Sequence, residues 1–276
     1  MREENTAGAE YVLGHSAAEV ERLIAQARVY EPLTRQFLLD AGLEAGMRVL
    51  DVGCGVGDVS FLAARLVGSD GQVVGIDRSP TAIEAASRRA QEQDASNVRF
   101  VVGDAGAMAV EERFDAAIGR FVLQFSRDPS TMLREIAAHV RPGGIIAFQE
   151  VDWSGCRSLP ELATFSGCIG WGVEALRGSG ADPYIGLKLH SVYTAAGLPA
   201  PALSLGAGIG AGPDQPIYAS IAGLMRSLLP AMERLGIATA EEVDVDTLAS
   251  RIGAEAVAEN VTVVWISMVG AVTRLL

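Results

Sequence analysis

The chain has 276 residues, with 22 Lys and Arg against 34 Asp and Glu, so its formal net charge is −12. Domains rarely exceed about 250 residues, so this length predicts one large domain or one domain with additions. Hydrophobic residues make up 49% of the chain, which predicts a sizeable core. The acidic balance argues against nucleic-acid and membrane partners, because both need clustered Lys and Arg.

The cysteines and the N-terminus predict a cytoplasmic protein. Cys54, Cys156 and Cys168 form no CxxC pair and have no zinc spacing, so we expect reduced thiols and no metal site. The first residues, MREENTAGAE, are polar and contain no apolar segment of a signal peptide. Two apolar stretches, 189–213 and 261–272, suit buried strands with turns better than membrane spans, because the first contains prolines and glycines and the second is too short.

The first part of the chain predicts two helices, from about Ser16 to Tyr30 and from Leu33 to Ala41, separated by Pro32. Apolar strands then alternate with amphipathic helices, which is typical of a parallel sheet covered on both faces. The expected strands are 48–52, 72–77, 98–102, 114–119 and 145–149, and the expected helices are 59–67, 79–93 and one from Asp128 that ends before Arg141. For the last third we expect helices at 160–176, 183–196, 215–235 and 239–258 and strands at 201–209 and 261–273.

The most informative motif is DVGCGVGD at residues 51–58, which leaves a strand and enters a helix. Glycines let the backbone approach a ligand closely, and a helix N-terminus presents free N–H groups. The spacing is G-x-G-x-G, which differs from the G-x-G-x-x-G of dinucleotide binders. Taken alone, the loop also fits an NAD enzyme or a tight turn.

Two carboxylates follow at the ends of the next two strands. Asp77 ends the strand at 72–77, where a carboxylate can accept both hydroxyls of a ribose. Asp104 comes just after the strand at 98–102. Since ligands of open α/β sheets bind beyond the carboxyl ends of the strands, we expect the glycine loop and both carboxylates to meet at one edge. Taken singly, Asp77 also fits a helix cap and Asp104 a turn.

The succession VLDVGCGVGD, VVGID, VVGDAGAM, FDAAIGRFVLQF and RPGG resembles the class I S-adenosylmethionine (SAM) dependent methyltransferases over about residues 47–150. The resemblance implies an α/β, Rossmann-like fold with a seven-stranded, mostly parallel sheet of order 3-2-1-4-5-7-6 and an antiparallel last strand. We expect an N-terminal helical arm (1–46) and a SAM-binding core (47–152). Residues 153–276 would complete the sheet and add a helical lid within the same domain.

The resemblance also implies which residues contact SAM. The glycine loop would contact the methionine part, Asp77 the ribose, and Asp104 with Ala105 the adenine. Arg120 stands where the family often turns a backbone carbonyl toward the amino group. The residues expected to bind SAM are Tyr11, Gln26, Gly53, Cys54, Gly55, Asp77, Arg78, Asp104, Ala105 and Arg120. Tyr11 and Gln26 also fit ordinary residues of the arm.

The acceptor side is predicted from the segments after the fourth and fifth strands. The segment GRFVLQF is similar to the small-molecule branch of the family, including quinone-type C-methyltransferases. We expect Glu150 and His15 as catalytic groups, and Asp152, Trp153 and Arg226 as substrate-binding residues. The alternatives are that Trp153 packs the lid, that Asp152 caps a turn, that Arg226 forms an ordinary ion pair and that His15 is structural or lies at the surface.

The expected function is methyl transfer from SAM, which becomes S-adenosylhomocysteine, to a small and largely apolar acceptor. The preferred detail is C- or N-methylation of an aromatic heterocycle such as an indole in natural-product biosynthesis. O-methylation and quinone-type C-methylation are the alternatives within the class. An NAD-dependent oxidoreductase or a non-catalytic nucleotide-binding module is the alternative from another class. A homodimer is also conceivable.

Overall fold

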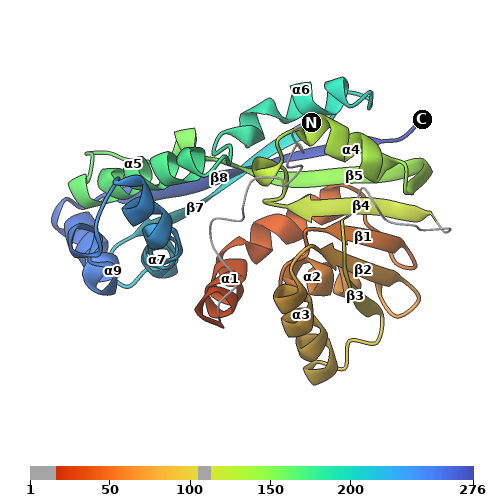
Figure 1. Cartoon of the computed structure of the whole chain (residues 1–276), viewed down its shortest axis with the longest axis horizontal. Coiled ribbons are helices and arrows are strands. Elements are labelled where there is room, and N and C mark those ends of the chain that lie inside the picture. The colour runs from red at the N-terminus through yellow and green to blue at the C-terminus, as the bar shows by residue number, and fades with distance from the viewer. Residues whose placement is uncertain (1–16, 105–112) are drawn as a thin grey trace, which may run out of the picture.

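The computed structural model describes residues 17–104 and 113–276 of the chain. Figure 1 shows a central sheet with helices on both faces, and two long strands that run from it into a second group of helices. The strands are β1 (Arg48–Val52), β2 (Gln72–Asp77), β3 (Val98–Val102), β4 (Phe114–Arg120), β5 (Val140–Asp152), β6 (Arg157–Ser158), β7 (Ala202–Ala211) and β8 (Thr262–Arg274).

The order of the sheet is β3-β2-β1-β4-β5-β8-β6, and β7 pairs with β8 as well. Neighbours among β1 to β5 are parallel, whereas β8 is antiparallel to β5, β6 and β7. Without the two-residue β6, which the sequence did not predict, this is the predicted order with its antiparallel last strand. The predicted fold class is therefore confirmed.

The helices begin and end close to the predicted positions. They are α1 (Ala17–Asp40), α2 (Asp58–Val67), α3 (Pro80–Glu92), α4 (Pro129–Ala137), α5 (Ala163–Gly178), α6 (Leu189–Ala195), α7 (Pro216–Leu235), α8 (Ala240–Val243) and α9 (Val245–Ala258), with 3-10 turns η2 (Leu123–Phe125), η3 (Trp153–Gly155) and η4 (Ile185–Lys188). The Ser79 hydroxyl caps α3 by accepting a hydrogen bond from the N–H of Ala82 at 3.2 Å. The Asp128 carboxylate caps α4 in the same way through Thr131. A proline at the first helical position follows each cap, as predicted.

The predicted break at Pro32 is wrong, because α1 is one helix with Pro32 inside it. Proline in a helix interior costs about 3 kcal/mol, since it removes a backbone N–H and crowds the preceding turn. Burial of the same helix offsets this cost: Tyr30, Thr34 and Leu38 are each no more than 1% exposed. The sequence pattern around Pro32 contains no sign of this packing, which depends on the distant elements α2, β7 and α7.

Two of the predicted C-terminal helices are also divided. The segment predicted as one helix at 239–258 splits at Asp244, whose φ of 41° lies in the left-handed region. Aspartate tolerates that region better than most residues. The segment predicted at 183–196 begins as the 3-10 turn η4 and becomes helical only at Leu189.

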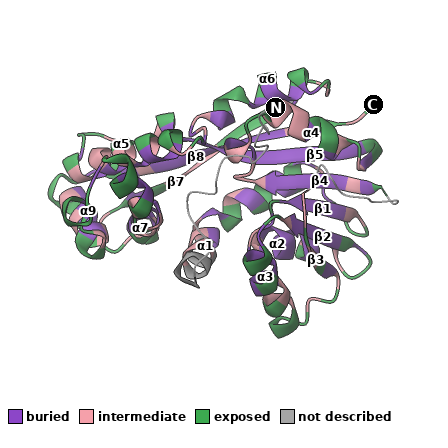
Figure 2. Ribbon diagram, in the orientation of Figure 1, coloured by how far each residue is buried: buried purple, intermediate pink, exposed green. Residues whose placement is uncertain are grey.

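The long strand β8 connects the sheet to the second group of helices, α5, α7 and α9 (Figure 1). β7 pairs with it along residues 262–272, β6 pairs with Val263 and Val264, and β5 pairs with residues 267–274. One contiguous core contains Leu50 and Ile76 of the sheet together with Met225 of α7 and Trp265 of β8. Figure 2 shows the same continuity, with buried residues along β8 from one end to the other. The division into arm, core and lid stays a prediction.

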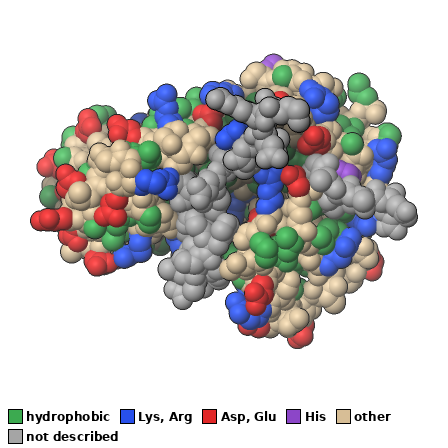
Figure 3. Space-filling model, viewed as in Figure 1, with side chains coloured by type: hydrophobic (Ala, Val, Ile, Leu, Met, Phe, Trp, Pro, Cys, Tyr) green, Lys and Arg blue, Asp and Glu red, His purple; other side chains and the backbone are tan. Residues whose placement is uncertain are grey.

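The surface reflects the acidic composition. Figure 3 shows acidic side chains along the outer side of the group formed by α5, α7 and α9. Among the helices of residues 17–104 and 113–276, none is both long enough and apolar enough to cross a membrane.

Candidate functional site

The glycine loop between β1 and α2 has a left-handed backbone at all three glycines. Gly53, Gly55 and Gly57 have φ of 62°, 53° and 90°. A Cβ at Gly53 would lie 2.8 Å from Val122, and one at Gly57 would lie 2.7 Å from Phe100, whereas one at Gly55 would meet nothing within 4 Å. The backbone at Gly55 therefore borders open space at the carboxyl edge of the sheet.

Asp77 lies beside this loop, as the sequence predicted. One carboxylate oxygen accepts a hydrogen bond from the N–H of Gly55 at 2.9 Å, and the other accepts one from the N–H of Ser79 at 2.8 Å. Each carboxylate oxygen can accept more than one hydrogen bond. The Asp77 carboxylate is therefore held in place by the backbone and can still accept ligand hydroxyls.

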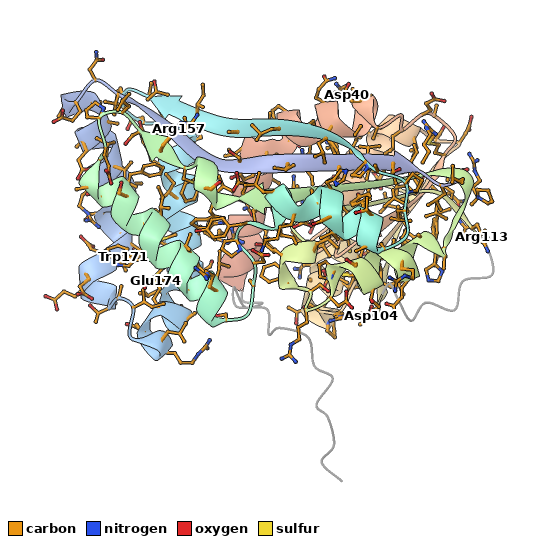
Figure 4. The ribbon with its side chains drawn as sticks, turned by 90° about the horizontal axis from the view of Figure 1, so that it is seen from above. Asp40, Asp104, Arg113, Arg157, Trp171 and Glu174 are labelled. Atoms are coloured by element: carbon orange, nitrogen blue, oxygen red, sulfur yellow. The ribbon has the colours of Figure 1, made fainter. Side chains whose placement is uncertain are left out.

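Two of the residues predicted to lie on the adenine side pair with each other. Arg78 forms an ion pair with Asp104, and their side chains are 66% and 39% exposed. Figure 4 shows Asp104 well away from α5, which carries Trp171 and Glu174. The Cys54 side chain is buried, so only its backbone can face a ligand. Ala105 lies outside the described residues.

Arg120, the last residue of β4, carries a positive charge that its neighbours balance only in part. Its guanidinium donates to the Thr34 hydroxyl at 3.1 Å, and that hydroxyl donates to Gln149 at 2.9 Å. The guanidinium also stands 5.6 Å from the Phe121 ring. It forms no ion pair with a carboxylate in the described part of the chain. Burial lowers the pKa of Arg120, and the negative charge of Asp58 opposes that shift. An anionic ligand group would stabilise this guanidinium.

Glu150, predicted as catalytic, is fully buried and supports the backbone after β4. One carboxylate oxygen accepts hydrogen bonds from the N–H groups of Val122 and Leu123, both at 2.8 Å. The other oxygen has no partner in the described structure. Burial raises the pKa of Glu150 to about 7, against the opposing effect of these backbone bonds. Its contacts are those of a residue that positions the segment after β4.

Asp152 and Trp153, predicted to bind the substrate, have structural partners as well. Asp152 accepts hydrogen bonds from the N–H and the hydroxyl of Ser154, at 2.9 and 2.6 Å. Trp153 is 2% exposed, and its ring meets Trp265 edge-on at 5.5 Å. A Cβ at Gly172 of α5 would lie 2.5 Å from the Trp153 ring. These contacts match the alternative interpretation, in which Asp152 caps a turn and Trp153 packs the lid.

The remaining predicted residues lie on α1, on α7 or outside the described residues. Arg226 of α7 forms a 2.6 Å ion pair with Asp246, with side chains 53% and 81% exposed. Gln26 of α1 is half-buried and accepts a hydrogen bond from Arg22 at 3.2 Å. Tyr11 and His15 lie outside the described residues. The site that the structure assembles is therefore the glycine loop with Asp77 and Arg120.

Comparison with known proteins gives the family of this segment. Residues 43–169 match the family described as "Methyltransferase domain". Over 132 residues, the chain is 33% identical to demethylmenaquinone methyltransferase of Staphylococcus aureus, covering 48% of this chain and 52% of that protein. Residues 43–169 are a class I SAM-dependent methyltransferase domain. The predicted resemblance and the predicted cofactor, SAM, are confirmed for this domain.

Further similarities of this methyltransferase domain extend to a natural-product enzyme and to a solved structure. The chain is 38% identical over 120 residues to aklanonic acid methyltransferase DauC of Streptomyces, covering 43% of this chain and 54% of that protein. Phospholethanolamine N-methyltransferase 2 of Haemonchus contortus aligns with a TM-score of 0.55 at 16% identity, covering 91% of this chain and 57% of that one. The last match shows the fold alone. The chain spans about half the length of the two curated relatives.

The residues of the methyltransferase domain fit SAM in charge and in shape. The open face of Gly55 leaves room that a Cβ would fill, and Asp77 offers oxygens for hydroxyl groups. Arg120 is a cation that suits the carboxylate at the methionine end. The sequence analysis used Arg120 only for its backbone and missed its side chain, because the partners Thr34 and Gln149 come from distant elements.

Proposed function

We propose that this protein transfers the methyl group of SAM to a small, largely apolar acceptor. The observation that carries the proposal is the bond from Gly55 to Asp77 beside an open glycine backbone. This arrangement suits a ribose above β2 and a methionine part along the loop. The activity of the whole chain is part of this proposal. We also propose a cytoplasmic location, which the three free thiols support. A homodimer stays a proposal too.

The proposed roles toward SAM follow the predicted set, with one addition. Gly53, Cys54 and Gly55 would contact it through their backbones and Asp77 through its carboxylate. The addition is that the Arg120 guanidinium binds the carboxylate of SAM. Arg78, Asp104 and Ala105 would border the adenine, and Tyr11 and Gln26 would cover the cofactor.

SAM supplies a methyl group already activated by the positive charge on its sulfur. The protein then mainly has to position the acceptor and exclude water, which contributes about 7–11 kcal/mol in well-oriented reactions. A general base is needed only where the acceptor must lose a proton. His15 stays a proposed base. For Glu150 we propose a positioning role, because its carboxylate is buried and holds Val122 and Leu123.

For the acceptor we propose an oxygenated aromatic ring that is methylated on carbon or oxygen, ahead of an indole-type heterocycle. The prediction of a heterocyclic acceptor depended on contacts from Asp152 and Trp153. Both side chains have structural partners instead. The Tyr30 hydroxyl, by contrast, is a donor with no partner among the described residues, and its ring meets Phe121 after β4. The two curated relatives are named for demethylmenaquinone and for aklanonic acid. Arg226 pairs with Asp246 at the surface, so we assign it no contact with the acceptor.

Calorimetry of the full chain with SAM, S-adenosylhomocysteine and NADH tests the proposal. We expect SAM and S-adenosylhomocysteine to bind and NADH not to bind. Binding of NADH alone would favour an oxidoreductase. Transfer of labelled methyl from SAM is then measured over hydroxyquinones, phenols, indoles and amines. SAM binding without transfer to any of them would favour the non-catalytic module, and transfer to indoles alone would favour the heterocycle.

A further inference from the structure

The hydroxyl of Tyr30 is a buried polar group with no partner in the described part of the chain. Tyr30 is 0% exposed, and its hydroxyl forms no hydrogen bond with residues 17–104 or 113–276. An unpaired buried polar group of this kind costs about 1–3 kcal/mol, so nearly all such groups in folded proteins are paired. A group brought by a ligand would remove this cost.

The position of Tyr30 places this hydroxyl near the end of β4. Its ring meets the ring of Phe121 edge-on, with centroids 5.6 Å apart. Phe121 follows β4 directly and has a φ of 61°. The next residue, Val122, packs against Gly53 of the glycine loop. Tyr30 is therefore connected through Phe121 and Val122 to the loop that is proposed to hold the methionine part of SAM.

The hydroxyl of Tyr30 keeps its proton in these surroundings. The charged groups that act on it electrostatically are the guanidiniums of Arg120 and Arg22, and the Cys156 thiol also lies in range. Burial raises the pKa of the thiol to about 12, so it is neutral at physiological pH. Burial also raises the pKa of Tyr30, so its phenol keeps its proton and can donate. A phenol that keeps its proton, with no acceptor among the described residues, favours a ligand atom that accepts a hydrogen bond.

The helix α1 brings four polar side chains to one side. Arg22, Gln26, Tyr30 and Thr34 are each four residues apart, a spacing that places them on one face of a helix. At one end of the row, Arg22 lies against Gly223 of α7. At the other end, Thr34 bonds Gln149 and Arg120. The row thus runs from the lid helices to the end of β4.

We propose that Tyr30 selects the acceptor, by donating a hydrogen bond from its hydroxyl to a carbonyl or oxyanion oxygen on an aromatic ring. The edge of Phe121 would lie against the same ring. This inference rests on the proposed function, because it names the acceptor class for the same site.

The test uses Tyr30→Phe, which removes the hydroxyl and keeps the ring. The probe is lawsone, a hydroxynaphthoquinone that is anionic at neutral pH, titrated by calorimetry into the full chain saturated with S-adenosylhomocysteine. We expect lawsone to bind the variant about 5–10-fold more weakly than the wild type, as for one lost hydrogen bond. Indole, whose ring carries no oxygen, should bind both proteins equally.

Two further readouts separate a recognition role from a merely structural one. The variant should bind S-adenosylhomocysteine like the wild type and should melt at the same or a higher temperature, because an unpaired buried hydroxyl is gone. Unchanged lawsone affinity in the variant, equal losses for lawsone and indole, or no lawsone binding to the wild type would each overturn the inference. Failure of the wild type to bind S-adenosylhomocysteine would instead overturn the proposed function.

Discussion

The carboxylate of Asp77 accepts a hydrogen bond from the backbone N–H of Gly55 at 2.9 Å. This bond ties the end of β2 to the loop that follows β1. Two elements that lie 22 residues apart in the chain thereby form one edge of the proposed cofactor site. Because the same carboxylate also accepts from Ser79, its position is set before any ligand binds.

Replacement of Asp77 by alanine is expected to weaken SAM binding about 10–100-fold, as for one or two hydrogen bonds to a charged group. Calorimetry with SAM measures the change. The control is Asp70→Ala, which removes an exposed carboxylate from the turn before the same strand and should leave SAM affinity as it is. Wild-type affinity in the Asp77 variant would contradict the ribose assignment.

Gly55→Ala and Gly46→Ala form a matched pair. Both glycines have positive φ, 53° and 84°, and a Cβ would meet nothing within 4 Å at either one. Each substitution should therefore cost a similar 1–2 kcal/mol, roughly, of folding stability. Only Gly55 borders the proposed site, so only its variant should lose SAM affinity, by about tenfold or more if the methyl group meets the ligand. Equal SAM affinities in the two variants would count against a ligand at Gly55.

Arg120→Met tests the proposed contact with the SAM carboxylate. S-adenosylhomocysteine should bind this variant roughly 10–100-fold more weakly, because a charged hydrogen bond contributes about 1.5–3 kcal/mol. Methylthioadenosine, which lacks the amino acid part, should bind both proteins alike. If both ligands lose affinity equally, Arg120 acts on the site as a whole and not on the carboxylate.

Tyr193→Phe is expected to destabilise the fold, in contrast to Tyr30→Phe. The Tyr193 hydroxyl donates to the carbonyl of Ala271 at 2.9 Å and accepts from the N–H of Phe148 at 3.2 Å. Its removal leaves two buried backbone groups without this partner, so the unfolding free energy should fall by about 1–3 kcal/mol. Thermal or urea unfolding of both variants measures the contrast. A Tyr30 variant that loses as much stability as the Tyr193 variant would show that its hydroxyl has a structural partner.

Glu150→Gln should change how stability depends on pH. The pKa of Glu150 is raised in the fold to about 7 from an ordinary 4.5, so the folded state holds the proton more tightly than the unfolded state. The contribution of this carboxyl is fully present below its unfolded pKa and is lost as pH rises through the folded one.

The comparison for Glu150 is the unfolding free energy of wild type minus that of the variant, which should fall by about 1–3 kcal/mol from about pH 4 to about pH 8. Burial also raises the pKa of Asp51 to about 7, and Asp51 titrates in both proteins. Its contribution to the pH dependence therefore cancels in the difference. A difference that stays constant across this range would contradict the raised pKa.

Much of the fold was predictable because its elements depend on local sequence patterns. The strand before Gly53 and the strand that ends in Asp77 are short and largely apolar, and Ser79 with Pro80 marks a helix start by its own chemistry. The glycine loop likewise follows from its own residues. The sequence by itself therefore determined the parallel sheet, the cofactor edge and the resemblance to the methyltransferases.

Only the tertiary structure decided what lies opposite that edge. Packing against α2, β7 and α7 buries α1 on both sides of Pro32, and the buried Tyr30 hydroxyl has no hydrogen-bond partner among the described residues. Glu150 looked like a catalytic carboxylate by its place after a strand, yet its partners Val122 and Leu123 belong to another loop. A hydrogen bond between segments far apart in the chain depends on how they pack, and the spacing of residues along one segment does not record that packing.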